Sequence, residues 1–176
     1  MFIHKVNAPV FIKRVLSHAE IKPKIISILN SGTRFSFGDS NVSISNTDYH
    51  LSPSFFEALG PKYWEVMAPE AHNHMQGVAE ALFLNKWDIS NYWFQEYQKG
   101  DRHSWHVHPG SMFTNVYYLS LPEGSMKTTL RVFGVETEFE VNEGDIMTIP
   151  SYIAHCSKPH CGDAPKIVVA FNSNVR

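Results

Sequence analysis

Two histidines one residue apart, and a third far along the chain, are the residues of this sequence best suited to chemistry. His106 and His108 lie in the segment HSWHVHP, and His155 follows the segment GDIMTIPSYIA. Side chains at positions i and i+2 of a β-strand share a face, so His106 and His108 would project together if Trp105 and Val107 point outward. Neutral imidazoles are good ligands for iron, zinc, copper and nickel. The pattern predicts a metal site with three histidine ligands and with positions left open for other ligands.

A lone His-x-His pair has a plainer explanation, in which one ring is exposed and the other forms a hydrogen bond. The second motif, with His155, favours metal binding over this explanation. Asp101 and His103 lie at the opposite parity from His106, so we expect them to be supporting or surface groups rather than ligands. Whether His108 is a ligand stays open on these residues alone.

The totals favour one globular domain over residues 1–176. The chain has 176 residues, 43% of them hydrophobic, which is enough for one sizeable core. A formal net charge of -2 provides no broad basic field for nucleic acid. The sequence contains neither a run of roughly eighteen apolar residues nor a signal-peptide pattern, so we expect no membrane segment and no processing. The two cysteines, Cys156 and Cys161, are too few for a secreted disulfide scaffold and favour free thiols in the cytoplasm.

Residues 1–89 predict a mainly helical N-terminal part that packs on the rest of the chain. Ser17 and Glu20 match a capping box that would open a helix through Leu29, ended by Gly32. Pro23 lies inside this helix and should kink it or delay its start.

Three further segments complete this half of the sequence. Residues 31–46 are rich in Ser, Gly, Asn and Thr and predict loops around a brief strand or hairpin. A short helix is expected after Ser52-Pro53, and a longer one from Pro69 to Asn85.

Residues 90–176 predict an antiparallel β-structure with the metal site in it. Short runs rich in aromatic and β-branched residues alternate with Gly, Pro, Asn and Asp turns, and their spacing suits hairpins rather than βαβ units. The expected fold is therefore mainly β: a double-stranded β-helix (jelly-roll, cupin-like) barrel buttressed by the N-terminal helices. The expected strands are NYWFQEY, HSWHVH, TNVYYLSL, TLRVF, TEFEV, DIMTI and KIVVAFN.

The segment from Trp93 to Asn172 resembles a known family on several motifs in order. The matching text is GDRHSWHVHPGSMFTNVYYLSLPEG, then EGDIMTIPSYIAHCSKPH, then KIVVAFN. It is similar to 2-oxoglutarate- and iron(II)-dependent oxygenases related to prolyl 4-hydroxylases, with members in marine bacteria and their phages. The resemblance implies Fe(II) as the metal, 2-oxoglutarate as co-substrate and dioxygen as oxidant.

The resemblance also implies roles for individual residues. His106 and His155 match the two ligand histidines, whereas the wider superfamily has Asp or Glu where this chain has His108. A three-histidine centre would be one unit of charge more positive than the usual one. Lys166 matches the basic residue that binds the distant carboxylate of 2-oxoglutarate, although on sequence grounds a lysine that blunts a strand edge is equally expected.

Three more polar residues are candidates for the co-substrate pocket. Asn115 and Tyr117 share one strand face and Tyr97 lies on the preceding strand, so all three could donate hydrogen bonds to 2-oxoglutarate. Ordinary packing is the competing explanation for both tyrosines.

The implied activity is decarboxylation of 2-oxoglutarate to succinate coupled to hydroxylation of an unidentified small-molecule or peptide substrate, with a peptidyl or free amino acid as the candidate. Two alternatives stay open. Gly100-x5-His106 and Gly144-x5-Pro150 also match cupin spacing, which would suit a metal-binding isomerase, lyase or sensor without 2-oxoglutarate. The other alternative is an inactive barrel that serves as a binding module. A homodimer through edge strands or added helices is compatible with either barrel.

Overall fold

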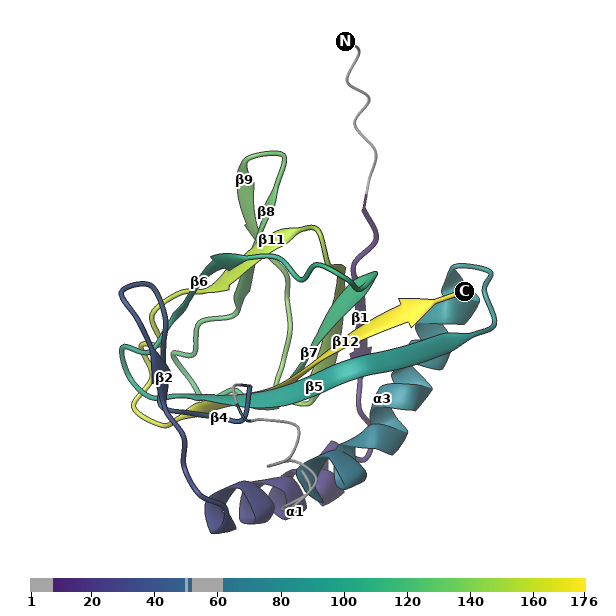
Figure 1. Cartoon of the computed structure of the whole chain (residues 1–176). Coiled ribbons are helices and arrows are strands. Elements are labelled where there is room, and N and C mark those ends of the chain that lie inside the picture. Colours follow the sequence, from purple (N-terminus) through teal and green to yellow (C-terminus); the bar gives the residue numbers. More distant parts are fainter. Residues whose placement is uncertain (1–7, 50, 52–61) are drawn as a thin grey trace.

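Two antiparallel sheets face each other, and two helices cover the outer face of the larger sheet (Figure 1). The computed structural model describes residues 8–49, 51 and 62–176. The larger sheet has the strand order β1 (Phe11–Arg14), β10 (Asp145–Pro150), β7 (Phe113–Ser120), β12 (Lys166–Val175), β5 (Trp87–Tyr97) and β4 (Asn46–Thr47). The smaller sheet has the order β6 (His103–His106), β11 (Ala154–Ser157), β8 (Thr128–Val132) and β9 (Val135–Glu138). This arrangement agrees with the predicted jelly-roll barrel.

Both faces of the larger sheet are buried, each in its own core. Phe94, Tyr117 and Phe171 pack toward the helices, in one cluster of buried residues. Val116 and Val168 point the other way, into the space between the two sheets, in a second cluster. Alternate residues of β7 and β12 therefore lie on opposite sides of one layer, as the pleat requires.

The first helix, α1 (His18–Ser31), forms where the sequence predicted it and ends before Gly32. The capping box is wrong: Ser17 makes no side-chain cap, and its hydroxyl instead donates to Glu70 Oε1 at 2.6 Å. Pro23 lies inside the helix and does not delay its start. Burial of Ile21, Ile25 and Leu29 against the larger sheet and the second helix supplies apolar contacts that offset the backbone bond a proline removes.

The second helix, α3 (Lys62–Ala81), begins seven residues before Pro69, which the sequence analysis took as its start. Tyr63 and Met67 are buried one turn apart, and Ala71 and Met75 continue the same stripe. This stripe packs on the larger sheet and on α1, so tertiary burial outweighs the proline. The short helix expected after Ser52-Pro53 falls outside the described residues.

Most of the expected strands are present, and the first strand after the helices begins at Trp87, four residues before the expected strand NYWFQEY. The hairpin expected within residues 31–46 is β2 (Phe37–Gly38) with β3 (Ser43–Ile44). The sequence did not predict three short strands, β1, β4 and β11, of which β11 carries His155. Each has two to four residues, too few for an alternation to show.

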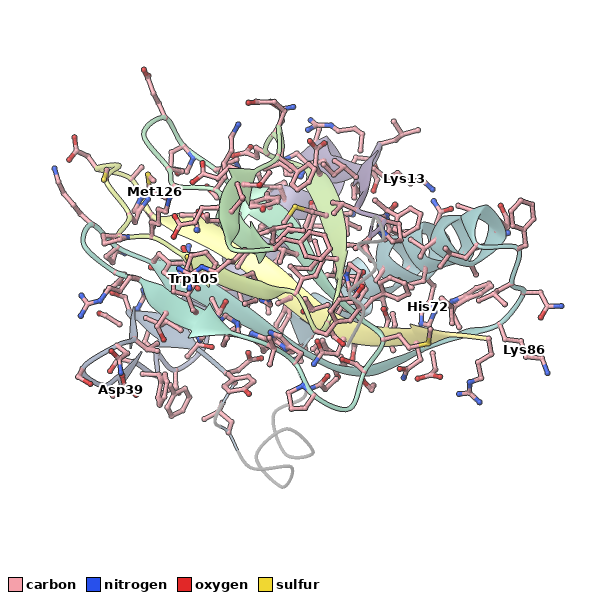
Figure 2. The ribbon with its side chains drawn as sticks, turned by 90° about the horizontal axis from the view of Figure 1, so that it is seen from above. Lys13, Asp39, His72, Lys86, Trp105 and Met126 are labelled. Carbon is pink, nitrogen blue, oxygen red and sulfur yellow. The ribbon has the colours of Figure 1, made fainter. Side chains whose placement is uncertain are left out.

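Charged side chains such as Lys13, Asp39 and Lys86 lie at the periphery of the molecule (Figure 2). Within the described residues, no helix has both the length and the apolar character needed to cross a membrane. Several carboxylates, among them Asp48 and Asp101, are buried, and so is Lys166, which is only 1% exposed and lies in the interior between the two sheets.

Candidate functional site

The three predicted ligands meet in the described structure. The ligand nitrogens of His106, His108 and His155 all lie within 4.8 Å of one another. His106 pairs directly with His155 across β6 and β11, and their ring centroids are 4.3 Å apart. His108 follows the end of β6, with its ring centroid 5.0 Å from that of His106. Trp105 points away from this cluster and stacks under Arg131, as predicted.

Two of the rings are oriented by backbone carbonyl groups. Nδ1 of His106 lies 2.8 Å from the carbonyl oxygen of Ser104, and Nδ1 of His155 lies 3.0 Å from that of Ile153. A carbonyl only accepts, so Nδ1 carries the proton in both rings and Nε2 keeps its lone pair. This tautomer is the one that a metal ligand needs, and the second nitrogen of a ligating histidine is commonly held in this way.

All three imidazoles are neutral at pH 7. Burial, followed by the neighbouring His155 and His103, lowers the pKa of His106 to about 3. Burial also lowers the pKa of His108 and of His155 to about 4. Neutral nitrogens offer lone pairs to a cation without first losing a proton, so the donor set fits a divalent metal.

The ring of His108 is held by stacking. Its plane lies 12° from that of Trp93, with centroids 5.5 Å apart, and the structure places no hydrogen-bond partner on this ring among the described residues. The ring of Tyr49 packs edge-on against that of Trp93, with ring centroids 5.1 Å apart. The third imidazole therefore depends on an aromatic contact rather than on a carbonyl.

His103 lies in the same cavity, contrary to the parity argument. Its ring centroid is 3.9 Å from that of His106. The register explains this: Ser157 pairs with His103 and His155 with His106, so two steps along β11 span three steps along β6. The extra residue is a β-bulge, which reverses the alternation and brings His103 to the face of His106. The only sign of this in the sequence is that His103 and His106 are three residues apart. In a regular strand that spacing places two side chains on opposite faces, so it would not have indicated a shared cavity.

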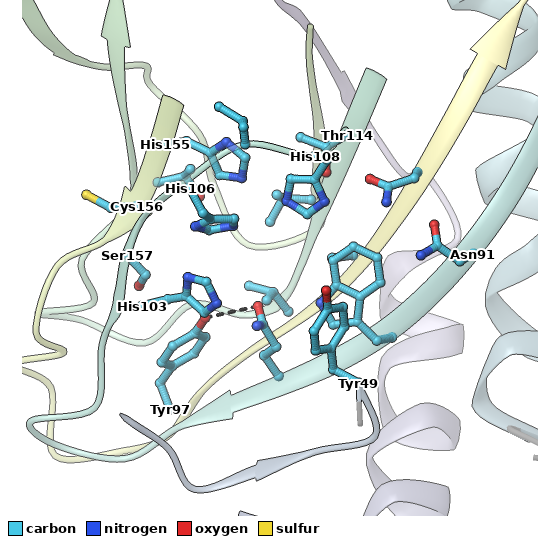
Figure 3. A pocket seen from close by; sticks show the side chains of 18 of the residues that line it. Tyr49, Asn91, Tyr97, His103, His106, His108, Thr114, His155, Cys156 and Ser157 are labelled. Atoms are coloured by element: carbon cyan, nitrogen blue, oxygen red, sulfur yellow. Dashed lines mark hydrogen bonds between the residues drawn. The ribbon is translucent and has the colours of Figure 1, made fainter. Parts of the chain in front are cut away.

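The histidines line a cavity of about 350 Å³ between the two sheets. Figure 3 shows Tyr97 and Ser157 on one side of the histidines, and Thr114 and Asn91 on the other. Lys166 lines the cavity from β12 beside Tyr97, with which it pairs across the strands. The cavity therefore has a cationic end and a neutral end, with the histidines along its wall.

Lys166 is fixed by three neighbours. Its ammonium nitrogen lies 2.7 Å from Ser157 Oγ and 2.9 Å from the carbonyl oxygen of Met126, and it stands 4.6 Å from the centre of the Tyr97 ring. Burial lowers the pKa of Lys166 to about 7, because no carboxylate compensates the charge. An anionic ligand at this end would supply the missing partner.

Tyr97 lines the pocket, as predicted, and its hydroxyl donates to Gln95 Oε1 at 2.9 Å. The prediction for Asn115 and Tyr117 is wrong, because both lie on the helix-facing side of β7. Asn115 is engaged with the carbonyl oxygen of Phe171 and with Ser173, and the hydroxyl of Tyr117 lies 2.6 Å from His18 Nδ1. Their neighbours Thr114 and Val116 face the pocket instead.

Comparison with known proteins bears on the fold. No protein-family model matches the sequence, and the comparison with curated proteins finds no match either. Among solved structures, the non-haem α-ketoglutarate-dependent epimerase SnoN from nogalamycin biosynthesis superposes with a TM-score of 0.71, at 11% identity over 94% of this chain and 77% of that chain. A prolyl-4-hydroxylase from Pseudomonas putida has a TM-score of 0.62, at 14% identity over 94% of this chain and 92% of that chain.

A third match is a prolyl hydroxylase from Trichoplax adhaerens, solved with a peptide fragment of the hypoxia inducible factor oxygen degradation domain. Its TM-score is 0.63, at 11% identity over 93% of this chain and 82% of that chain. At such identities the likeness concerns the fold alone. The chain therefore has the double-stranded β-helix fold found in 2-oxoglutarate- and Fe(II)-dependent oxygenases, as its sequence resemblance predicted.

Proposed function

We propose that this chain is a 2-oxoglutarate- and Fe(II)-dependent dioxygenase that hydroxylates an organic substrate. The observation that carries the proposal is the pairing of three neutral imidazoles with a buried lysine in one cavity. His106, His108 and His155 would hold the metal, and Lys166 would bind the distant carboxylate of 2-oxoglutarate. The solved structures of this fold that bind these cofactors support the assignment by analogy.

The residues of the pocket have distinct parts in this function. A bound Fe(II) would supply the oxidising chemistry with dioxygen and 2-oxoglutarate. The chain orients His106 and His155 through their Nδ1 protons, so that both Nε2 atoms face one point. Lys166 and Tyr97 fix one end of the co-substrate, and the walls of the cavity keep water away from the reacting groups.

His108 distinguishes this site from the two-histidine, one-carboxylate pattern and supports a second candidate. Three neutral ligands leave a metal dication with one more unit of positive charge than the usual set does. A strongly polarising metal would also suit an isomerase or lyase, and one solved structure with this fold is described as an epimerase. The choice between the two therefore depends on whether 2-oxoglutarate binds to the metal.

An anaerobic titration with Fe(II) and then 2-oxoglutarate tests the proposal. A weak visible charge-transfer band of the metal-chelated 2-oxo acid is expected in the native protein and absent in His106→Ala. His72→Ala is the matched control, since His72 is an exposed histidine on α3 outside the cavity. Metal binding without the band would favour the second candidate. A protein that binds no divalent metal contradicts both.

The native location is a smaller part of the proposal. Cys156 and Cys161 are free thiols, as expected. Free thiols and an Fe(II) cofactor both fit a reducing compartment, so we propose a cytoplasmic enzyme.

A further inference from the structure

Three polar side chains cross the floor of the pocket at the end away from Lys166. Asn172 on β12 pairs with Thr114 on β7 and with Asn91 on β5, and all three line the cavity. We call Asn91, Thr114 and Asn172 the amide row. Six residues of extended strand separate Lys166 from Asn172, which corresponds to roughly 20 Å. If Lys166 holds the co-substrate, the amide row lies where the second substrate must enter.

Asn172 carries an acceptor that no described residue satisfies. The residue is 7% exposed, and its side-chain oxygen is buried without a hydrogen-bond partner among the described residues. A buried acceptor without a donor costs about 1–3 kcal/mol. This oxygen has almost no accessible surface, so a ligand N–H or O–H group reaches it only when the carboxamide of Asn172, which lines the cavity, turns toward the ligand. That hydrogen bond would then remove the cost.

An apolar strip lies between the amide row and the co-substrate end. Ala170 pairs with Val116 and with Trp93, two residues along the same three strands, and all three line the cavity. A substrate that satisfies Asn172 would therefore place an apolar part over this strip, beside the histidines. The floor thus matches a molecule with a polar group next to a hydrocarbon group.

The charge of the pocket decides what kind of polar group fits. Among the described residues that line it, Lys166 is the charged side chain. The two negative charges of 2-oxoglutarate would balance a divalent metal held by three neutral histidines, so the loaded pocket would keep the positive charge of Lys166. A substrate ammonium would be buried in a positive field, which is costly. A substrate carboxylate would compete with 2-oxoglutarate for the positive groups of the pocket, the bound metal and Lys166. A neutral group avoids both penalties.

We infer that the amide row binds an uncharged amide of the substrate, and that the site therefore rejects free amino acids. An amide has one N–H donor and one C=O acceptor, so it can pair with both ends of an asparagine carboxamide. This inference rests on the proposed function, whose candidate substrates include both peptidyl and free amino acids. The amide could belong to a peptide or to a small carboxamide, which share this chemistry.

Matched probes test the inference without turnover. The N-acetyl, N-methylamide derivatives of leucine, proline and phenylalanine are each paired with the free amino acid and titrated into Zn(II)-loaded, 2-oxoglutarate-bound protein. Zinc does not undergo redox chemistry, so only binding is observed. The readout is the NMR signal of the Asn91 and Asn172 side-chain amides. At least one blocked derivative is expected to bind about tenfold more tightly than its free partner and to shift these signals.

Variants of Asn172 test whether the tighter binding of the blocked derivative depends on this residue. Asn172→Leu should weaken the blocked derivative about tenfold, whereas Asn30→Leu, at an exposed position on α1, should not change it. Asn172→Asp adds a negative charge in nearly the same shape, so it should shift the preference toward the free amine. Zinc and 2-oxoglutarate binding are measured first for each variant, which separates misfolding from loss of the subsite.

The outcomes separate this inference from the proposed function. Free amino acids that bind as tightly as their blocked partners, or blocked derivatives that never bind, overturn the inference even where zinc and 2-oxoglutarate do bind. Failure of metal or 2-oxoglutarate binding contradicts the proposed function, and the same titration of metal-free protein then still tests Asn172. Capped tripeptides compared with butyramide show whether the amide comes from a peptide or from a small molecule.

Discussion

Lys166 is the side chain on which 2-oxoglutarate binding is expected to depend most. Lys166→Met keeps much of the apolar stem and removes the charge, so the affinity for 2-oxoglutarate should fall roughly 10- to 100-fold, the worth of a charged hydrogen bond. Metal affinity should stay within about twofold, because Lys166 is not among the clustered ligands. Isothermal titration calorimetry measures both. Lys99→Met, at an exposed ion pair with Asp163, is the control, and equal losses in the two variants would contradict the role of Lys166.

The lowered pKa of Lys166 also predicts a pH dependence. Below about pH 7 the free protein already carries the ammonium, so 2-oxoglutarate binds without taking up a proton. Above pH 7 the lysine is neutral and must be protonated on binding, so the affinity should weaken by up to about tenfold per pH unit. Calorimetry in two buffers of different ionisation enthalpy measures the proton uptake. An affinity that does not change between pH 6.5 and 8.5 would show that Lys166 keeps its charge in the free protein.

Trp93 is expected to act through His108, on which it stacks. Trp93→Leu should lower metal affinity about tenfold, at the lower end of the range for groups that orient a ligand. Trp93→Phe should keep most of the native metal affinity, because a flat ring remains to stack on His108. If Trp93 served only general packing, Trp93→Leu and Trp93→Phe would have the same metal affinity. Competition with a zinc chelator measures the metal affinity of each variant. The control is Trp105→Leu, outside the cavity under Arg131.

Individual residues differed in how well the sequence predicted them. Spacing predicted that His106, His108 and His155 lie together, as they do, since i and i+2 share a strand face and the second motif supplied a partner. Asn115 and Tyr117 were placed on the wrong face. Strand β7 is buried on both faces, so the pattern of apolar and polar residues does not indicate which face lines the pocket.

At the scale of elements, a tight turn connects the two sheets beside the site. Strand β5 ends at Tyr97 and β6 begins at His103, and the buried carboxylate of Asp101 organises the turn between them. It accepts hydrogen bonds from the hydroxyl of Ser43 at 2.5 Å, from the backbone N–H of Gln98 at 2.8 Å and from that of Ser45 at 3.0 Å. Burial opposes its charge, but the bonds from Ser43 and Ser45 outweigh it and lower the pKa of Asp101.

Loss of this carboxylate is expected to destabilise the turn and the β2–β3 hairpin that it joins. Asp101→Ala should lower the free energy of unfolding by about 2–4 kcal/mol, because several donors lose a charged acceptor at once. Asp163→Ala, which removes an exposed ion pair, should leave the free energy of unfolding almost unchanged. Urea unfolding of both variants measures the difference. Equal stabilities would mean that water replaces the carboxylate in this turn.

The bulge in β6 is the element that sequence reasoning could not predict. A strand of four residues offers no alternation long enough to show that one residue is extra. The bulge is defined by its partner β11, which is itself too short to be predicted. The longer strands β5, β7, β10 and β12 were predicted because their composition and turns are visible locally.

For the molecule as a whole, buried histidines predict a loss of stability in acid. His74 is buried, and burial lowers its pKa to about 4. Burial also lowers the pKa values of His155, which is buried, and of His106 and His108, which are half-buried. Unfolded histidines take up protons near pH 6.5, so the unfolded chain binds more protons than the folded one between about pH 6.5 and 4. The free energy of unfolding should therefore fall as the pH falls through this window. Burial raises the pKa of Asp48 to about 6, which offsets part of the effect with the opposite sign.

Chemical denaturation of metal-free protein at pH 7, 6 and 5 measures this loss, which should be on the order of a few kcal/mol. His74→Gln removes one of the titrating groups and can keep the contact with Thr148, so its pH curve should be shallower than that of the native chain. Zinc at about 100 times its dissociation constant should add about 2.7 kcal/mol at pH 7. A pH-independent stability would show that the histidines have the same pKa values in the folded and unfolded chains.

The order in which the chain is synthesised gives the central strand an unusual place in folding. Strand β12 follows every other strand in the sequence, yet it lies between β7 and β5 in the larger sheet. On a translating ribosome, β5 and β7 therefore emerge without the strand that joins them, and their edges stay unpaired until residues 166–175 appear. Such long-range pairing is slow and exposes strand edges to aggregation in the meantime. The same strand carries Lys166 and Asn172, so both ends of the pocket floor form in the step that closes the sheet.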